Sequence, residues 1–135
     1  MLVRDRLPFE AMAAAAEHFG LRVEETGIVR LRWPPGLRIT GQLAAAAMAA
    51  VDELNSGRER PLLVEMAGTD TPSREARARF GERSSVCRVA LLGRSAVDRV
   101  RASLVPQLGH RGYPVPTRFF TSEPAAVAWL LEAEV

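Results

Sequence analysis

The chain contains no lysine, and all eighteen of its basic residues are arginine. High-GC coding bias is the simplest origin of this usage. It still has a chemical consequence, because it excludes Schiff-base chemistry, a lysine general base and the phosphate-binding lysine of Walker-type loops.

Cysteine, long apolar runs and a leader pattern are scarce or missing as well. A single cysteine, Cys87, excludes an internal disulfide and suits a reducing compartment. The longest apolar run, Leu43 to Val51, is far shorter than a membrane span. The first ten residues include Arg4, Asp5 and Glu10, which interrupt any signal-peptide core. We therefore expect a cytoplasmic protein with no membrane partner.

Recognised catalytic and cofactor motifs are absent too. The two histidines, His18 and His110, do not combine with Cys87 into a standard zinc spacing. No Gly-x-Ser-x-Gly elbow and no Gly-rich dinucleotide fingerprint is present. These absences predict no catalytic residues, no metal site and no cofactor, and hence a protein that is not an enzyme. An enzyme whose acid and base come from unlinked positions is the alternative.

Charge and composition favour an ordinary folded domain. A chain of 135 residues with 47% apolar and 25% charged residues can bury one core. The net charge of +2 comes from arginines scattered along the chain, without the interleaved aromatics of nucleic-acid-binding modules. We expect no nucleic-acid partner.

The apolar pattern predicts a hairpin followed by alternating helices and strands. Thr26-Gly27 separates two strand-like runs, which is a hairpin signal. Alternation of this kind indicates a largely parallel sheet with an antiparallel first strand. The predicted strands are 21–25, 28–33, 61–67, 86–92 and 117–120, and the predicted helices are 41–56, 72–83, a segment after Ser95 and a segment after Thr121.

Hydroxyl residues mark the expected helix starts, and apolar spacing marks the expected buried faces. We predict N-caps at Thr40, Thr71 (before Pro72), Ser95 and Thr121. Asp98, three residues after Ser95, completes a capping box. The predicted inward faces are Leu43, Ala47, Val51 and Leu54; Ala76 and Phe80; Val97, Val100 and Leu104; and Val127, Leu130 and Leu131.

The first twenty residues do not belong to this alternating pattern. Residues Pro8 to Phe19 have the spacing of a helical face that ends at Gly20, with a frayed tail as the alternative. We expect an N-terminal helical extension over residues 1–20 and one α/β domain over residues 21–135. The hairpin can leave a sheet edge open to a homodimer, and the N-terminal segment could either cover that edge or cross to a neighbouring copy.

From Leu21 to the end, the chain resembles a group of small uncharacterised STAS-like proteins. These share the SpoIIAA-like fold of the anti-sigma-factor antagonists, a mixed sheet in which an N-terminal hairpin precedes alternating helices and strands. The resemblance implies a regulatory or scaffolding domain that binds a partner protein. The segments that carry it are Trp33-Pro34-Pro35-Gly36, Pro61-Leu62-Leu63-Val64, Ser73-Arg74-Glu75-Ala76-Arg77, Phe120-Thr121-Ser122-Glu123-Pro124-Ala125 and Trp129-Leu130.

In anti-sigma-factor antagonists, a serine or threonine in the loop after the third strand is phosphorylated by a partner kinase. That family's pattern is an aspartate, two hydroxyl residues and a glycine. Here the glycine is absent and Pro72 separates the hydroxyl residues. The resemblance predicts a partner-binding loop or phospho-switch over Gly68 to Ser73. Its residues would be Thr69, Asp70, Thr71 and Ser73, together with Arg74 and Arg77 of the helix that follows.

Two other interpretations stay open for these features. Thr71 can be a plain helix cap beside solvated arginines, and such caps are far commoner than phosphorylation sites. The chain can also be a small-molecule or lipid carrier of similar topology, which would need an apolar cavity above a few hundred cubic ångströms. Glu65, inside an otherwise apolar strand, is expected to pair with an arginine at the strand edge.

Overall fold

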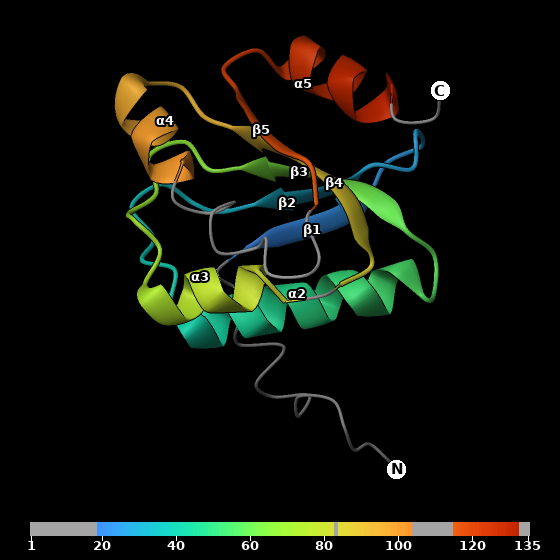
Figure 1. The fold of residues 1–135 in the computed structure, drawn as a ribbon, viewed down its shortest axis with the longest axis horizontal. Coiled ribbons are helices and arrows are strands. Elements are labelled where there is room, and N and C mark those ends of the chain that lie inside the picture. Colours follow the sequence, from blue (N-terminus) through green and yellow to red (C-terminus); the bar gives the residue numbers. More distant parts are fainter. Residues whose placement is uncertain (1–18, 83, 104–114, 133–135) are drawn as a thin grey trace.

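The computed structural model describes residues 19–82, 84–103 and 115–132, and these residues contain one five-stranded sheet with order β1-β2-β3-β4-β5 (Figure 1). β1 runs antiparallel to β2, and β2 to β5 are parallel. The mixed α/β sheet predicted from the sequence is confirmed. Its elements are β1 Gly20–Val23, β2 Val29–Arg32, α2 Gly41–Asn55, β3 Arg60–Glu65, α3 Arg74–Phe80, β4 Val86–Leu92, α4 Ala96–Ala102, β5 Thr117–Phe120 and α5 Glu123–Leu131.

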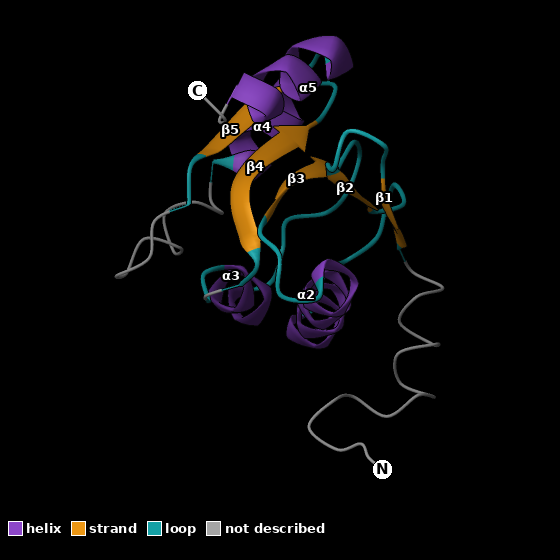
Figure 2. Cartoon of the chain, turned by 90° about the vertical axis from the view of Figure 1, so that its right-hand side faces the viewer, coloured by secondary structure: helices purple, strands orange, loops and turns teal. Residues whose placement is uncertain are grey.

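The sheet separates two apolar clusters. Helices α2 and α3 lie below one face, and α5 lies on the other (Figure 2). Val29, Leu31 and Val64 belong to the larger cluster, on the side of α2. Ile28 and Leu63 belong to the smaller cluster, which includes the buried residues of α5. The neighbouring residues Leu63 and Val64 of β3 therefore face opposite layers, as the period of a strand requires.

Side-chain caps begin the described helices, but two of them differ from the predicted positions. Thr40 caps α2 as predicted, since its Oγ1 accepts the Leu43 N–H at 3.1 Å. The prediction for α3 was wrong, because its cap is Ser73 rather than Thr71. The Ser73 N–H donates to the Ile39 carbonyl at 3.0 Å, which holds Ser73 extended and delays the helix by two residues.

The last helix also starts one residue later than predicted. Ser122, and not Thr121, caps α5, with its Oγ accepting the Ala125 N–H at 3.3 Å. Pro124 then occupies the first turn, where its missing N–H costs nothing. Leu130 faces inward as predicted, whereas Leu131 is 39% exposed.

Helix α4 has its two valines on the outside, which contradicts the predicted inward face. Val97 is 55% exposed and Val100 is 64% exposed, whereas Asp98 and Ala102 are buried. The helix is turned this way because the Asp98 carboxylate accepts hydrogen bonds from the backbone of Gly68 and Arg94, in the loops after β3 and β4. In α2, Ala47 and Val51 are buried as predicted, but Leu54 is 39% exposed.

Residues 1–18 and the predicted contact residue Leu104 lie outside the described residues, as does His110. Phe19 is not helical; it packs in the core, edge to face on Trp33 with ring centroids 5.4 Å apart. Gly20 already belongs to β1, one residue before the predicted domain start. None of the described helices is long and apolar enough to cross a membrane.

Gly93, directly after β4, lies in close contact with two other elements. A Cβ at this position would be 2.7 Å from Asp98 Cβ and 2.8 Å from Phe119 Cε1. We expect Gly93→Ala to lower the free energy of unfolding by about 1–3 kcal/mol through overpacking, measured by denaturant titration. Gly20→Ala is the control, because its Cβ would lie 3.8 Å from its nearest neighbour, Arg32 Cβ. Equal stability of Gly93→Ala and the wild type would contradict the packing described at this end of β4.

Candidate functional site at the carboxyl ends of the strands

Three loops and α4 meet where the parallel strands β2, β3 and β4 end. In open α/β sheets, ligands usually bind outside the carboxyl ends of the strands. The loops enclose a groove of about 390 Å³, with one wall formed by α4. Its lining residues are Arg32, Trp33, Pro35, Glu65, Ala67, Gly68, Arg94, Ser95, Val97, Asp98 and Arg101.

The loop between β3 and α3, residues 66–73, is held along its length. The Thr69 hydroxyl donates to the Met66 carbonyl at 2.9 Å, which closes the first turn of the loop. Three backbone hydrogen bonds then join it to the segment between β2 and α2: Gly36 N to Gly68 O at 2.8 Å, Asp70 N to Leu37 O at 3.1 Å, and Ser73 N to Ile39 O at 3.0 Å.

Asp98 of α4 holds the same loop from its other side. One carboxylate oxygen accepts the Gly68 N–H at 3.2 Å, and the other accepts the Arg94 N–H at 2.8 Å. Asp98 is 3% exposed, so its carboxylate depends on these protein donors for its hydrogen bonds. The Arg101 guanidinium donates to the Thr69 carbonyl, which adds a second link from α4 to the loop.

Some of the predicted loop residues are exposed to solvent, and others are buried or hydrogen-bonded within the loop. Asp70, Thr71 and Arg74 are exposed. Thr69 is 1% exposed, so its hydroxyl stabilises the loop and is not offered to a partner. Ser73 is half-buried, and its Oγ accepts the Ala76 N–H at 3.0 Å as the cap of α3.

Arg77, the remaining predicted residue, is also half-buried, and its Nε has no hydrogen-bond partner among the described residues. The predicted set therefore reduces to a surface formed by Asp70, Thr71 and Arg74.

Sequence reasoning missed the groove beside this surface. Arg32, Arg94 and Arg101 come from three separate elements, so no local spacing could reveal that they line one groove. One signal for the groove was available in the sequence, because Asp98 is the lone acidic residue of α4 and lies at its third position. The capping-box prediction accounted for Asp98 without a contact to another loop. Ser95 Oγ does accept the Asp98 N–H at 3.2 Å, but the Asp98 carboxylate binds Gly68 and Arg94 instead of completing the box.

A second polar cluster, centred on Arg30 of β2, lies on the face of the sheet that α5 covers. Arg30, which is 8% exposed, donates to three carboxylates: Glu24 at 2.6 Å, Glu65 at 2.5 Å and Glu123 at 2.7 Å. The predicted pairing of Glu65 with an arginine is confirmed. These contacts join the β1–β2 turn, the end of β3 and the start of α5, so the cluster fastens α5 to the sheet.

The ion pairs shift the pKa values of Glu24 and Arg30 within this cluster. A hydrogen bond from Arg30 lowers the pKa of Glu24 below its usual value, against burial, which raises it. Burial alone would lower the pKa of Arg30, but hydrogen bonds to Glu65, Glu123 and Glu24 outweigh it and raise that pKa. A buried arginine that is matched by carboxylates on three elements is best explained as a structural link.

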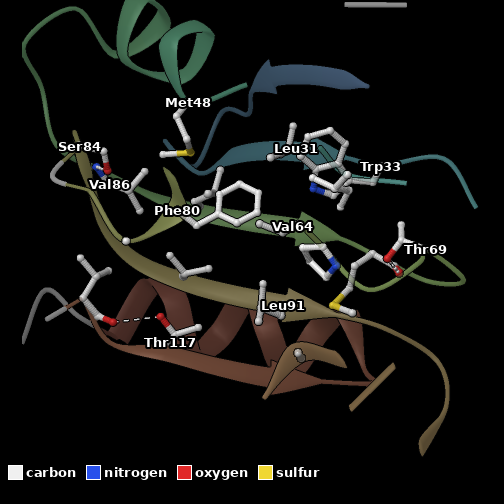
Figure 3. A pocket seen from close by; sticks show the side chains of 18 of the residues that line it. Leu31, Trp33, Met48, Val64, Thr69, Phe80, Ser84, Val86, Leu91 and Thr117 are labelled. Carbon is white, nitrogen blue, oxygen red and sulfur yellow. Dashed lines mark hydrogen bonds between the residues drawn. The ribbon is translucent and has the colours of Figure 1, made fainter. Parts of the chain in front are cut away.

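An apolar cavity of about 100 Å³ lies between the sheet and the helices α2 and α3. Figure 3 shows Met48, Phe80, Leu31, Val64 and Leu91 around it. Trp33 and Thr69 close its end near the groove. In the part of the chain that the structure describes, no three His, Cys, Asp or Glu side chains come together as a metal site would require.

Comparisons with known proteins identify the fold and the family. The sequence model of one family, described as a domain of unknown function (DUF7793), matches residues 21–134. An uncharacterised protein of the DUF3478 family from Shewanella loihica PV-4, which has a SpoIIAA-like fold, is similar in structure, with a TM-score of 0.58 and 15% identity. The similarity covers 83% of this chain and 91% of that one. The SpoIIAA-like fold that the sequence resemblance predicted is thus confirmed.

A second solved structure, a protein of unknown function from Arthrobacter sp. FB24, is 46% identical over 83% of this chain and 98% of that one, with a TM-score of 0.35. No curated protein matches the chain.

The lowered pKa of Glu24 predicts a pH-dependent contribution to stability. The pKa of Glu24 is lower in the folded state than its value of about 4.5 in the unfolded chain. The Glu24 carboxylate therefore stabilises the fold at pH values above 4.5, and this contribution is lost as the pH falls through the folded-state pKa. Glu24→Gln should reduce the free energy of unfolding by about 1 kcal/mol at neutral pH. The difference from the wild type should shrink as the pH falls through the acid range.

Denaturant titration over a series of pH values measures this difference. Glu25→Gln, at the exposed neighbouring position, is the matched control and should keep the wild-type profile. Parallel pH profiles for the wild type and Glu24→Gln would show that the ion pair with Arg30 does not stabilise the fold.

Proposed function

The chain belongs to the DUF7793 family, and from this membership and its SpoIIAA-like fold we propose that it is a non-enzymatic regulatory module that binds a partner protein. The binding surface would be the carboxyl edge of the sheet, centred on Asp70, Thr71 and Arg74. The proposed location is cytoplasmic.

One observation carries the proposal: the loop over residues 66–73 is rigidly held yet presents polar side chains. Its backbone bonds to the β2–α2 segment and to Asp98 fix its shape before any partner arrives. A preformed surface loses little conformational entropy on binding, which favours recognition. Asp70, Thr71 and Arg74 project from this fixed backbone, with a donor, an acceptor and both signs of charge.

A phospho-switch in the same loop is the finer form of the proposal. Among its hydroxyl residues, Thr71 is the exposed one, because Thr69 is buried and Ser73 caps α3. A phosphate on Thr71 would add about two negative charges at the point where the partner would bind. Arg74, exposed three residues along the chain, supplies a cation close by in sequence.

The alternative function is a carrier of a small apolar ligand. The cavity between the sheet and the helices α2 and α3 has the apolar lining that such a carrier needs. Its volume of about 100 Å³ is smaller than an engineered cavity of about 150 Å³ that holds benzene. The cavity size therefore supports partner binding over transport of a lipid or drug-sized ligand.

Affinity capture from the native host tests the proposed function. The baits are the wild type, a loop variant that combines Asp70→Ala, Thr71→Ala and Arg74→Ala, and a control, Arg58→Ala. Arg58 is exposed in the turn between α2 and β3, at the other end of the strands. We expect one protein to be captured by the wild type and the control, with a yield at least ~10-fold lower for the loop variant, as loss of interface anchors predicts.

Peptide mapping of the chain from the same cells reports phosphate on Thr71. Equal capture by the loop variant would contradict the proposed surface, and an unmodified Thr71 under every growth condition would contradict the switch. Matched melting curves of the three baits exclude unfolding as the cause of any loss.

A further inference from the structure

The groove beside the 66–73 loop has three arginines in its lining. Arg32 extends from the end of β2, Arg94 follows β4, and Arg101 lies on α4. The Arg32 side chain is 69% exposed, and its Nε lies 3.9 Å from the nearest oxygen of Glu65. Among the described residues, no carboxylate forms an ion pair with the side chain of Arg94 or Arg101. Much of this positive charge is thus not neutralised by the fold.

The two acidic residues of the groove are occupied by internal contacts. Asp98 is 3% exposed and accepts the N–H groups of Gly68 and Arg94. Glu65 has one oxygen 2.5 Å from Arg30, in the cluster that fastens α5. The three arginines of the lining outnumber these two carboxylates, so the net charge of the groove is positive.

An exposed apolar strip adjoins these arginines. Val97 lines the groove and is 55% exposed, and Val100, one turn further along α4, is 64% exposed. Arginine is enriched at protein–protein interfaces and among the residues that dominate binding energy, and the adjoining apolar strip offers area that a partner can bury.

We propose that the groove binds an acidic segment of the partner protein, with carboxylates on Arg32 and Arg94 and an apolar side chain against Val97. The proposal rests on the proposed function, because it names the chemistry of the partner at the same edge of the sheet. Guanidinium groups bind carboxylates through paired hydrogen bonds, and three arginines in one groove favour an acidic chain.

A protein segment fits this surface better than a free small molecule does. Gly68 and Ala67 line the groove and also begin the loop that presents Asp70 and Thr71, so one partner can contact both. An anionic membrane is less suited, because two exposed valines on a seven-residue helix offer little apolar area to insert.

Fluorescence anisotropy with a labelled glutamate-rich peptide that contains one leucine tests this proposal. The matched probe has glutamine in place of every glutamate. The groove variant combines Arg32→Gln and Arg94→Gln, and Arg58→Gln is the charge-matched control at the far end of the strands. We expect the groove variant to bind the acidic probe at least ~10-fold more weakly than the wild type, and the control to bind it as the wild type does.

Val97→Ser separates the apolar contact from the charge, and should weaken binding of the acidic probe at high salt, where ionic attraction is screened. Melting curves establish that each variant is folded, and Arg94→Gln alone replaces the double variant if the latter is not.

Several outcomes would overturn the proposal. In the first, the wild type binds the glutamine probe as tightly as the acidic probe. In the second, Arg58→Gln weakens binding of the acidic probe as much as the groove variant does. In the third, the groove arginines are needed for binding to vesicles of phosphatidylcholine and phosphatidylserine and not for binding to the peptide. The proposed function is tested separately by capture with the loop variant. If that variant loses the native partner while the groove variant retains it fully and binds the acidic probe as the wild type does, only the groove proposal fails.

Discussion

The buried carboxylate of Asp98 organises the end of the sheet that carries the candidate site. It receives the N–H groups of Gly68 and Arg94, which belong to the loops that follow β3 and β4. A carboxylate that is 3% exposed is tolerable only when its oxygens are satisfied, so the two loops and α4 must occupy fixed relative positions. The same requirement turns α4 so that Val97 and Val100 face outward. The shape of the loop and the apolar strip beside the groove therefore have one physical cause.

The Arg30 cluster has the corresponding role on the face of the sheet that α5 covers. Each strand of the hairpin is only four residues long, and the smaller apolar cluster contains few buried residues, so apolar packing alone gives this face limited stability. Arg30 offsets this by linking Glu24, Glu65 and Glu123, which belong to different elements. The hairpin and α5 are thus held on this face by ion pairs as well as by apolar packing.

Local sequence patterns were sufficient to predict the order of the strands and helices, but they were insufficient to predict the candidate site. The strand over Val86–Leu92 and the cap at Thr40 are encoded by neighbouring residues, and both predictions are confirmed. The cap of α3 was misplaced because Ser73 is held by the Ile39 carbonyl, a partner that lies far away in the sequence. The face of α4 was wrong for the same kind of reason, since apolar spacing cannot show that a buried aspartate outweighs two valines. The groove arginines converge only through the topology of the sheet.

Amide hydrogen exchange measured by NMR tests most directly whether the 66–73 loop is preformed in the free protein. The relevant amides are those of Gly68, Asp70 and Ser73, which donate to Asp98, Leu37 and Ile39. A rigid presenting loop predicts exchange slowed by about 100-fold or more at all three, as for backbone groups that open only with the surrounding structure. Asp98→Asn should speed exchange at Gly68 first. Exchange at the rate of an unstructured peptide in the wild type would contradict a surface that is shaped before its partner binds.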